Sequence, residues 1–213
     1  MLPFPDRAAA GAELGEALKA LQLERPVVLA VPRGGILVAV PVAEALGGEL
    51  DVVVVRKVGA PTNPELGLGA VGPIGPPVLD MHLVGSLGVS EEFLEREVAA
   101  QREEARRRVA AYRGGAAPVS VAGRDAVVVD DGIATGGTVI AAGKLLRAGE
   151  PKRLVLAVPV APIEALSKVR PFYDEVVCPH TPEPYIAVGQ WYTDFHQVTD
   201  DEVRGLMGAD GPG

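Results

Sequence analysis

Residues 126–138 read AVVVDDGIATGGT and hold the pattern that decides how this chain folds. The β-branched run over 127–129 predicts a buried strand, and two adjacent carboxylates, Asp130 and Asp131, come directly after it. A loop rich in glycine and threonine follows, and it leads into a predicted helix. Glycines let the backbone turn tightly and approach a ligand closely, while the N–H groups that open a helix bind anions. The stretch therefore predicts a strand, an acidic pair and a phosphate-binding loop, in that order.

The acidic pair is expected to bind a different part of the ligand from the loop. Carboxylates repel a phosphate, but they accept hydrogen bonds from vicinal sugar hydroxyls or from a hydrated Mg²⁺. A sugar phosphate satisfies both halves of the stretch. Gly132, Gly137 and Thr138 are spaced as in the nucleoside-triphosphate loop GxxxxGKS/T, but Thr138 occupies the position of its lysine, so we reject that motif. A buried strand with a polar turn and a helix cap is the alternative without a ligand.

The same residues resemble the signature of the phosphoribosyltransferases that use phosphoribosyl pyrophosphate (PRPP). That signature consists of a hydrophobic strand, two acidic residues and a small-residue loop that ends in Thr-Gly-x-Thr, here residues 135–138. The resemblance implies an α/β fold of type I, in which helices flank a parallel doubly wound sheet and a small C-terminal hood, here approximately residues 179–198, covers the site. It implies that Asp130 and Asp131 hold the ribose hydroxyls at the catalytic centre, and that the 5′-phosphate is bound by Ile133, Ala134, Thr135, Gly136, Gly137 and Thr138.

Outside this stretch, predicted strands and helices alternate along the chain. Such alternation is typical of a parallel sheet that helices cover on both faces, and 213 residues suffice for one such domain, residues 1–213. Asp6, Ser90 and Thr199 are predicted to cap helices, and Pro41 predicts a kink or a later start in the helix that contains it. Strands are predicted over 27–31, 52–55, 154–158 and 175–178, two short paired strands over 68–72 and 78–81, and helices over 36–46, 91–113, 138–148 and 163–169.

Two further loops follow predicted strands and carry positive charge. In a doubly wound sheet, ligands bind at the carboxyl ends of the strands, so these loops are expected to meet the signature loop. Arg33, Gly34 and Gly35 follow the first predicted strand and resemble the family's pyrophosphate loop, with backbone N–H groups and a guanidinium for an anion. Arg56 and Lys57 follow the second predicted strand, where they would compensate the charge of the pyrophosphate. The alternatives are a plain strand-to-helix turn and an exposed basic pair.

Aromatic side chains gather in residues 182–195, although only 4% of the chain is aromatic. In the family a C-terminal hood covers the nucleophile, usually a nucleobase, so the resemblance places Trp191 and Tyr192 against the acceptor ring. In an extended chain Trp191 and Phe195 share one face and Tyr192 takes the other, and we expect Tyr192 to stack on the acceptor. The segment departs from the 6-oxopurine enzymes because no lysine follows Lys168. A small core under a long loop is the alternative.

Composition excludes several classes of protein and partner. The formal net charge of −8 argues against a nucleic-acid-binding surface, and the single cysteine, Cys178, excludes an internal disulfide and a thiolate zinc site. The N-terminus carries neither a basic leader nor an apolar signal core, and glycine and proline interrupt the longest uncharged run, residues 66–79. We therefore expect a cytoplasmic protein that binds neither nucleic acid nor a membrane. Residues 82–118, where the family often has a mobile catalytic loop, read here as a charged helix, and no catalytic residue is assigned to them.

These features predict a phosphoribosyltransferase that displaces pyrophosphate from PRPP with a nitrogen nucleophile, which we expect to be a nucleobase. Mg²⁺ is the expected cofactor, held mainly by PRPP and not by a protein metal site. The partners are then small molecules, PRPP and an acceptor, and a homo-oligomer is compatible with this function. A regulatory protein of the same fold, which binds PRPP or a nucleotide without turnover, is one alternative. A phosphatase with Asp130 or Asp131 as its nucleophile is another, and the glycine at position 132, where its acid partner would stand, disfavours it.

Overall fold

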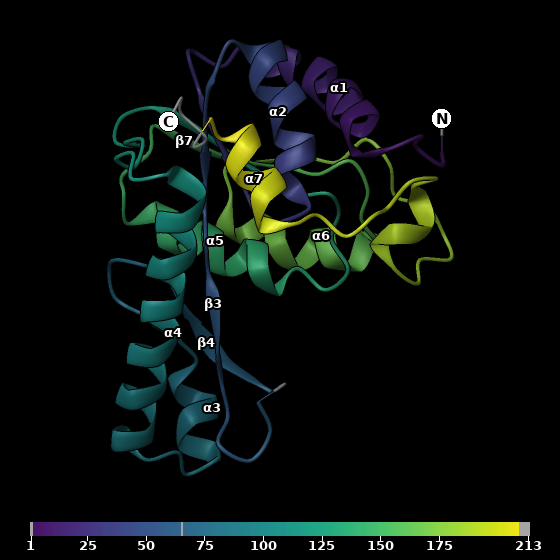
Figure 1. The fold of residues 1–213 in the computed structure, drawn as a ribbon. Helices are drawn as coiled ribbons and strands as arrows, with labels where there is room; N and C mark the ends of the chain where they lie inside the picture. The colour runs from purple at the N-terminus through teal and green to yellow at the C-terminus, as the bar shows by residue number, and fades with distance from the viewer. Residues whose placement is uncertain (1, 65, 209–213) are drawn as a thin grey trace.

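A parallel sheet of five strands forms the centre of the molecule, which the computed structural model describes over residues 2–64 and 66–208. The strand order is β2-β1-β6-β7-β8, and every neighbouring pair is parallel. Helices pack on both faces of this sheet (Figure 1), so the predicted α/β fold with a doubly wound parallel sheet is confirmed. The strands are β1 (Val27–Ala30), β2 (Glu49–Val52), β6 (Asp125–Val129), β7 (Arg153–Ala157) and β8 (Glu175–Val177).

The order of the strands reverses between β1 and β6, which pair with each other along all of β1. From β1 the chain passes through α2 (Gly35–Leu46) to β2 on one side, and from β6 it passes through α5 (Gly137–Arg147) to β7 on the other. Such a switch point leaves a crevice at the carboxyl ends of its two strands, because their loops leave in opposite directions. The loop after Ala30 and the signature loop after Val129 both begin there.

Alternating side chains of the strands form two cores, one on each face of the sheet. Val28 and Ala30 point into the first core, which α1, α2, α7 and the end of α4 cover. Val27 and Leu29 point into the second, which α5 and α6 cover. Because apolar residues are buried on both faces, these strands appear in the sequence as continuous apolar runs. The remaining helices are α1 (Arg7–Leu18), α3 (Met81–Ser86), α4 (Glu91–Arg113), α6 (Ile163–Val169) and α7 (Asp200–Leu206), with short 3-10 helices η1 (Lys19–Leu21), η2 (Arg170–Phe172) and η3 (Val188–Trp191).

A second, smaller sheet extends away from the first as an arm, residues 56–98 (Figure 1). Its three strands are antiparallel, and α3 and the first half of α4 pack on them through a separate apolar cluster around Val58, Leu68 and Val84. The predicted pairing of the segments 68–72 and 78–81 is confirmed, except that Met81 begins α3. The strands of the arm are β3 (Arg56–Gly59), β4 (Gly67–Val71) and β5 (Val78–Leu79).

Short-range signals set the helix ends as predicted. Asp6, Ser90 and Thr199 each accept a hydrogen bond from the backbone N–H three residues further on, and so cap α1, α4 and α7. Helix α2 begins at Gly35 and runs through Pro41, so the predicted later start is wrong. No described helix is both long enough and apolar enough to cross a membrane.

The second strand of the main sheet lies earlier in the chain than predicted. The predicted segment was 52–55, whereas β2 ends at Val52, and Val53 and Val54 are buried beyond its end. An apolar β-branched run indicates burial but does not show where the ladder of hydrogen bonds stops. Arg56 and Lys57 consequently open strand β3 of the arm, and their predicted position in a loop at the end of β2 is wrong.

Candidate active site

The loop after β1 and the signature loop after β6 touch at the switch point of the sheet. A Cβ atom on Gly34 would lie 2.0 Å from Asp131 Oδ2, and one on Gly35 would lie 3.2 Å from Asp130 Oδ1. The first distance is shorter than real Cβ contacts, so a side chain at position 34 would force the Asp131 carboxylate or the turn to move. The structure thus brings the predicted Gly34–Gly35 turn directly against the predicted acidic pair.

Asp131 is held through its side chain and its backbone. Its Oδ2 atom accepts a hydrogen bond from Arg7 Nε at 2.7 Å, its N–H donates to Asp130 Oδ1 at 2.9 Å, and its carbonyl oxygen accepts the hydroxyl hydrogen of Tyr192. Among the described residues, the side chains and the backbone N–H groups of other residues donate to neither Asp130 Oδ2 nor Asp131 Oδ1. One oxygen of each carboxylate is therefore left to accept a hydrogen bond from a ligand, as two vicinal hydroxyls require.

The two adjacent carboxyl groups are electrostatically unfavourable in the absence of a ligand. Burial raises the pKa of Asp130 well above its ordinary value, and the neighbouring Asp131 raises it further. Burial also raises the pKa of Asp131, while the hydrogen bond and the positive charge of Arg7 oppose that rise. The pair therefore resists carrying two negative charges, and a ligand that donates hydroxyl hydrogens would stabilise the charged form.

The signature loop presents an exposed surface at the N-terminus of α5. Helix α5 has no side-chain cap, so the N–H groups of its first turn are open to an anion. Gly136 has a φ of +88°, a conformation that favours glycine, and it turns the loop into the helix. Ile133 is buried and its N–H donates to Val160 O at 3.2 Å, so it anchors the loop, and a contact of Ile133 with a phosphate stays a prediction. The exposed residues of the loop are Ala134, Thr135, Gly137 and Thr138.

Arg33 lies beside the same crevice and is partly exposed. Its Nη1 atom is 4.0 Å from Asp200 Oδ1, and Tyr112 donates its hydroxyl hydrogen to that same oxygen at 2.8 Å. Burial and the interaction with Asp200 raise the pKa of Tyr112 to about 12. Helix α4 thus brings Tyr112 and Arg108 to the site, which sequence reasoning missed because nothing in its charged pattern marks these two residues. They line a cavity of about 40 Å³ together with Val31, Pro32, Val53, Val54, Val55 and Thr138.

Arg56 and Lys57 are carried into the arm. Arg56 Nε donates to Gln101 Oε1 of α4 at 3.1 Å, and Lys57 is exposed on β3. The cavity at the strand ends is lined by Val55, the residue before this pair, and by neither cation. Arg56 and Lys57 therefore do not lie at the carboxyl end of a strand of the main sheet, which was the reason for assigning them to pyrophosphate. Their binding to pyrophosphate stays a prediction.

The predicted hood packs on the N-terminal segment and is not an extended strand. The Tyr192 ring lies 5.2 Å from the Phe195 ring between centroids, and the Trp191 ring lies 5.9 Å from that of Tyr185. Trp191 and Phe195 therefore do not share a face, and that prediction is wrong. The reason is that helix η3 ends at Trp191, so the alternation of an extended chain does not apply.

The two hood residues assigned to the acceptor differ in their surroundings. Tyr192 is only 6% exposed and belongs to a small core with Phe4, so its ring is enclosed by protein. Trp191 is half-buried, and its Nε1 atom has no hydrogen-bond partner among the described residues. The hydroxyl of Tyr185 is likewise buried and unpartnered within the described chain. Unpaired buried donors of this kind are rare in folded proteins, so each of the two is a candidate to donate to ordered water or to a ligand.

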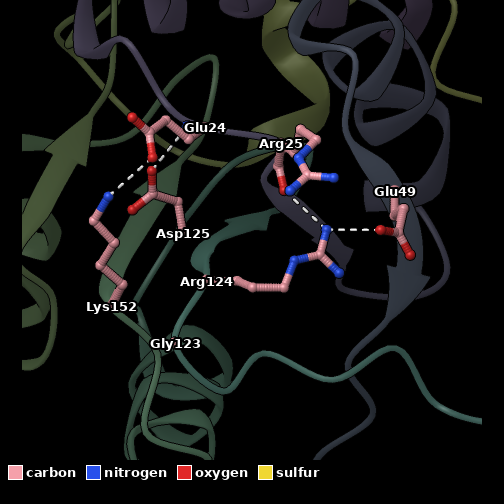
Figure 2. Close-up of a pocket in the computed structure, with 7 residues that line it drawn as sticks. All are labelled: Glu24, Arg25, Glu49, Gly123, Arg124, Asp125 and Lys152. Carbon is pink, nitrogen blue, oxygen red and sulfur yellow. Dashed lines mark hydrogen bonds and ion pairs between the residues drawn. The ribbon is translucent and has the colours of Figure 1, made fainter.

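A larger pocket, of about 680 Å³, lies at the opposite edge of the sheet, where the strands begin (Figure 2). Four of its charged residues form two ion pairs, Arg124 with Glu49 at 2.7 Å and Lys152 with Glu24 at 3.3 Å. The buried Asp125 accepts a hydrogen bond from Glu24 N at 3.0 Å. Doubly wound sheets bind ligands at the carboxyl ends of their strands, so we place the candidate active site at the signature loop and not in this larger pocket.

Comparison with known proteins shows the family to which this chain belongs. The family model of the phosphoribosyl transferase domain matches residues 7–189. "Putative phosphoribosyl transferase MT0597" of Mycobacterium tuberculosis (strain CDC 1551 / Oshkosh) is 43% identical over 204 residues, which cover 96% of this chain and 46% of that protein, so the chain spans about half its length. The crystal structure of TT1426 from Thermus thermophilus is 48% identical, has a TM-score of 0.88, and aligns over 97% of this chain and 98% of that one. The chain belongs to the phosphoribosyl transferase family.

Proposed function

We propose that this protein transfers ribose 5-phosphate from PRPP to a nitrogen nucleophile, a nucleobase, and releases pyrophosphate. The observation that carries the proposal is the contact of Gly34 and Gly35 with Asp130 and Asp131. It joins a turn suited to a diphosphate to an acidic pair suited to ribose hydroxyls, within one crevice. Membership of the phosphoribosyl transferase family supports the same reaction.

The signature loop is assigned the ribose 5-phosphate half of the donor. The exposed hydroxyls of Thr135 and Thr138 and the N–H groups that open α5 would receive the phosphate. Asp130 Oδ2 and Asp131 Oδ1 would accept hydrogen bonds from the 2′- and 3′-hydroxyls of the ribose. A hydrogen bond to a charged acceptor contributes about 1.5–3 kcal/mol, so loss of both carboxylates should weaken PRPP binding on the order of 100-fold or more.

The diphosphate half is assigned to the turn after β1, with Arg33 as its counter-charge. Arg33 is 4.0 Å from Asp200, and Arg108 lies 2.8 Å from Glu104, so a diphosphate has to compete for both cations. Positive charge from these residues is therefore incomplete, which fits a Mg²⁺ ion carried by the diphosphate itself. When bound, Mg²⁺ supplies neutralisation of the leaving diphosphate.

The reaction breaks the bond between ribose C1 and a diphosphate oxygen and forms a bond between C1 and the acceptor nitrogen, whose proton leaves to solvent. Positive charge develops on the ribose ring while the first bond breaks. The carboxylates of Asp130 and Asp131, next to the ribose hydroxyls, favour that charge electrostatically. The hood would exclude water, which would otherwise hydrolyse the donor.

We assign the contact with the acceptor ring to Trp191 and withdraw the preference for Tyr192, because the Tyr192 ring is enclosed by protein. Trp191 offers a partly exposed ring and an unpartnered Nε1 atom, and Tyr185 next to it offers an unpartnered hydroxyl within the described chain. Both atoms are buried in the free protein, so a ring that carries hydrogen-bond acceptors would satisfy them by entering between the side chains of the hood. Stacking of a base on an aromatic side chain contributes roughly 1–3 kcal/mol, so Trp191→Ala should raise the acceptor KM about ten-fold.

Pyrophosphate release tests the proposal. The protein is incubated with PRPP, Mg²⁺ and each member of a panel of nucleobases, beside an Asp130→Asn/Asp131→Asn double variant. Asp174→Asn is the matched control, because Asp174 is a partly exposed carboxylate paired with Arg147 at 3.0 Å and lies outside the site. We expect one base to release pyrophosphate with the wild type and the control, and about 100-fold less kcat/KM with the double variant.

Each alternative predicts a different result. PRPP binding without pyrophosphate release in the presence of any base would identify a regulatory protein. A phosphoaspartate trapped at Asp130 or Asp131 would identify a phosphatase. Turnover that the double variant retains in full would remove the acidic pair from the reaction.

A further inference from the structure

Arg7 is the buried cation of the candidate site, and its position in the sequence gave no indication of this. The described residues include three buried charged side chains, and the other two, Asp51 and Asp125, lie on the strands of the main sheet. Arg7 is only 6% exposed, although it is the first residue of α1, where an exposed side chain is usual. A buried charge is costly unless it is paired, so the pairing of Arg7 needs a reason.

The guanidinium of Arg7 contacts both the signature loop and the hood. Its Nε atom donates to Asp131 Oδ2 at 2.7 Å, and its Nη1 atom donates to His196 O at 3.0 Å. Its central carbon lies 3.7 Å from the centroid of the Phe195 ring, in a cation–π contact. One side chain therefore joins α1, the acidic pair and the segment that covers it.

The contact with Arg7 also gives the two oxygens of the Asp131 carboxylate different surroundings. Oδ2 is taken by Arg7 and enclosed by Gly34, where a Cβ atom would lie 2.0 Å from that oxygen and 3.2 Å from Arg7 Nε. Oδ1 accepts no hydrogen bond from any other described residue. Arg7 thus fixes the rotation of the carboxylate and leaves one defined oxygen for a ligand.

We propose that Arg7 is a positioning residue for ribose recognition, which holds Asp131 as a charged acceptor with Oδ1 open to a ribose hydroxyl and holds the hood over it. The inference rests on the proposed function and adds a residue to it. A merely structural clasp would also need Arg7, so the test has to measure the charge state of the site as well as the fold.

Titration of Asp131 supplies that measurement. The groups that face it are Arg7 from α1, Asp130 from its own loop, and the hydroxyls of Tyr185 and Tyr192 from the hood. Of these, Arg7 is the cation, and it lowers the pKa of Asp131 against the effect of burial. Removing the guanidinium would raise the pKa of Asp131. A protonated carboxyl is a weaker acceptor of a hydrogen bond from a hydroxyl than a charged carboxylate is. PRPP binding would then require a higher pH.

The experiment compares the affinity for PRPP with Mg²⁺ across pH in the wild type, Arg7→Lys and Arg7→Met, with circular dichroism to establish folding. Arg147→Met is the matched control, because Arg147 also pairs with an aspartate, Asp174, but is 45% exposed and outside the site. We expect Arg7→Met to bind PRPP about ten-fold more weakly or worse at neutral pH and to shift the acidic limb of binding to higher pH. Arg7→Lys should keep the position of that limb, because it keeps the charge, and Arg147→Met should match the wild type.

A folded Arg7→Met variant with the affinity and pH limb of the wild type would overturn the inference and leave the proposed function intact. If the wild type itself fails to bind PRPP, the proposed function falls, and this inference with it. Should Arg7→Met not fold, the double variant Arg7→Met/Asp131→Asn removes the unpaired charge and Arg7→Lys still reports the limb. A limb in Arg7→Lys displaced to clearly higher pH than that of the wild type would then refute a role for the positive charge.

Discussion

Replacement of Gly34 by alanine tests whether the two loops of the site meet as described. The new Cβ atom would lie 2.0 Å from Asp131 Oδ2, 2.8 Å from Asp131 Cγ and 3.2 Å from Arg7 Nε. To relieve the shortest contact, the carboxylate or the turn has to move by roughly 1 Å or more, and this breaks the 2.7 Å hydrogen bond from Arg7. A single methyl group is thus expected to disturb both the packing and the charge pair.

The cost of Gly34→Ala follows from these two effects. Overpacking costs about 1–3 kcal/mol, and the loss of a hydrogen bond between charged groups costs about 1.5–3 kcal/mol, so the free energy of unfolding should fall by about 2.5–6 kcal/mol. For a chain of this length the midpoint temperature should fall by roughly 5–24 °C. PRPP affinity should fall about ten-fold or more, because displacement of a binding group by about 1 Å weakens the interactions that depend on it.

Thermal unfolding and PRPP titration of the same samples measure both effects. Gly85→Ala is the matched control, since Gly85 lies in α3 and its Cβ atom would meet nothing within 4 Å. Alanine is the better helix former, so the free energy of unfolding of this control should equal that of the wild type or exceed it by up to about 1 kcal/mol. A Gly34→Ala variant that matches the wild type in both midpoint temperature and PRPP affinity would refute the contact between the loops.

Three other substitutions test separate parts of the structure. Asp130→Asn should weaken PRPP binding yet stabilise the free protein, because the raised folded-state pKa of Asp130 means that ionisation of its carboxyl lowers stability as the pH rises above the ordinary carboxyl range. The midpoint temperature of the variant should exceed that of the wild type by a margin that grows with pH, at about 2–4 °C per kcal/mol, and a margin that shrinks with pH would contradict this. Asp51→Ala should lower the free energy of unfolding in urea by about 3–5 kcal/mol, because it leaves the buried guanidinium of Arg113 without its carboxylate. Asp174→Ala, at a partly exposed ion pair, should cost much less, and equal losses would refute the difference between the buried and the exposed pair. Tyr192→Phe should lower the free energy of unfolding by about 0.5–1.5 kcal/mol and change PRPP affinity by no more than a few-fold, because it removes one hydrogen bond to the backbone of the signature loop. A loss of affinity above ten-fold in calorimetry would indicate that Tyr192 contacts the ligand.

The parts of the site that depend on neighbouring residues could be predicted from the sequence. The β-branched run, the acidic pair and the glycines of the signature follow one another directly, and the turn at Gly34 and Gly35 follows its own strand in the same way. Helix caps at Asp6 and Ser90 likewise depend on contacts three residues apart. Knowledge that parallel strands expose their carboxyl ends at one edge was then enough to predict that the two loops converge.

The parts that depend on distant contacts could not be predicted. Arg7 and Asp131 are 124 residues apart, and a capped helix start indicates an exposed side chain, not a buried ion pair. Arg56 was misplaced because apolar patterning shows burial but not the point where β2 ends and β3 begins. The faces of the hood were misassigned because η3, a single short turn, breaks the alternation before Tyr192 and carries no periodic signal of its own.

The central claim is that the signature loop and its acidic pair bind a ribose 5-phosphate donor. Calorimetric titration with PRPP and Mg²⁺ tests this claim most directly. We expect saturable binding at one site per chain by the wild type and Asp174→Asn, a loss on the order of 100-fold or more in Asp130→Asn/Asp131→Asn, and stabilisation of the wild type by roughly 2.7 kcal/mol at a hundred times the Kd. Absence of binding by a folded wild type to PRPP, ribose 5-phosphate and nucleoside monophosphates alike, or full affinity in the double variant, would contradict it.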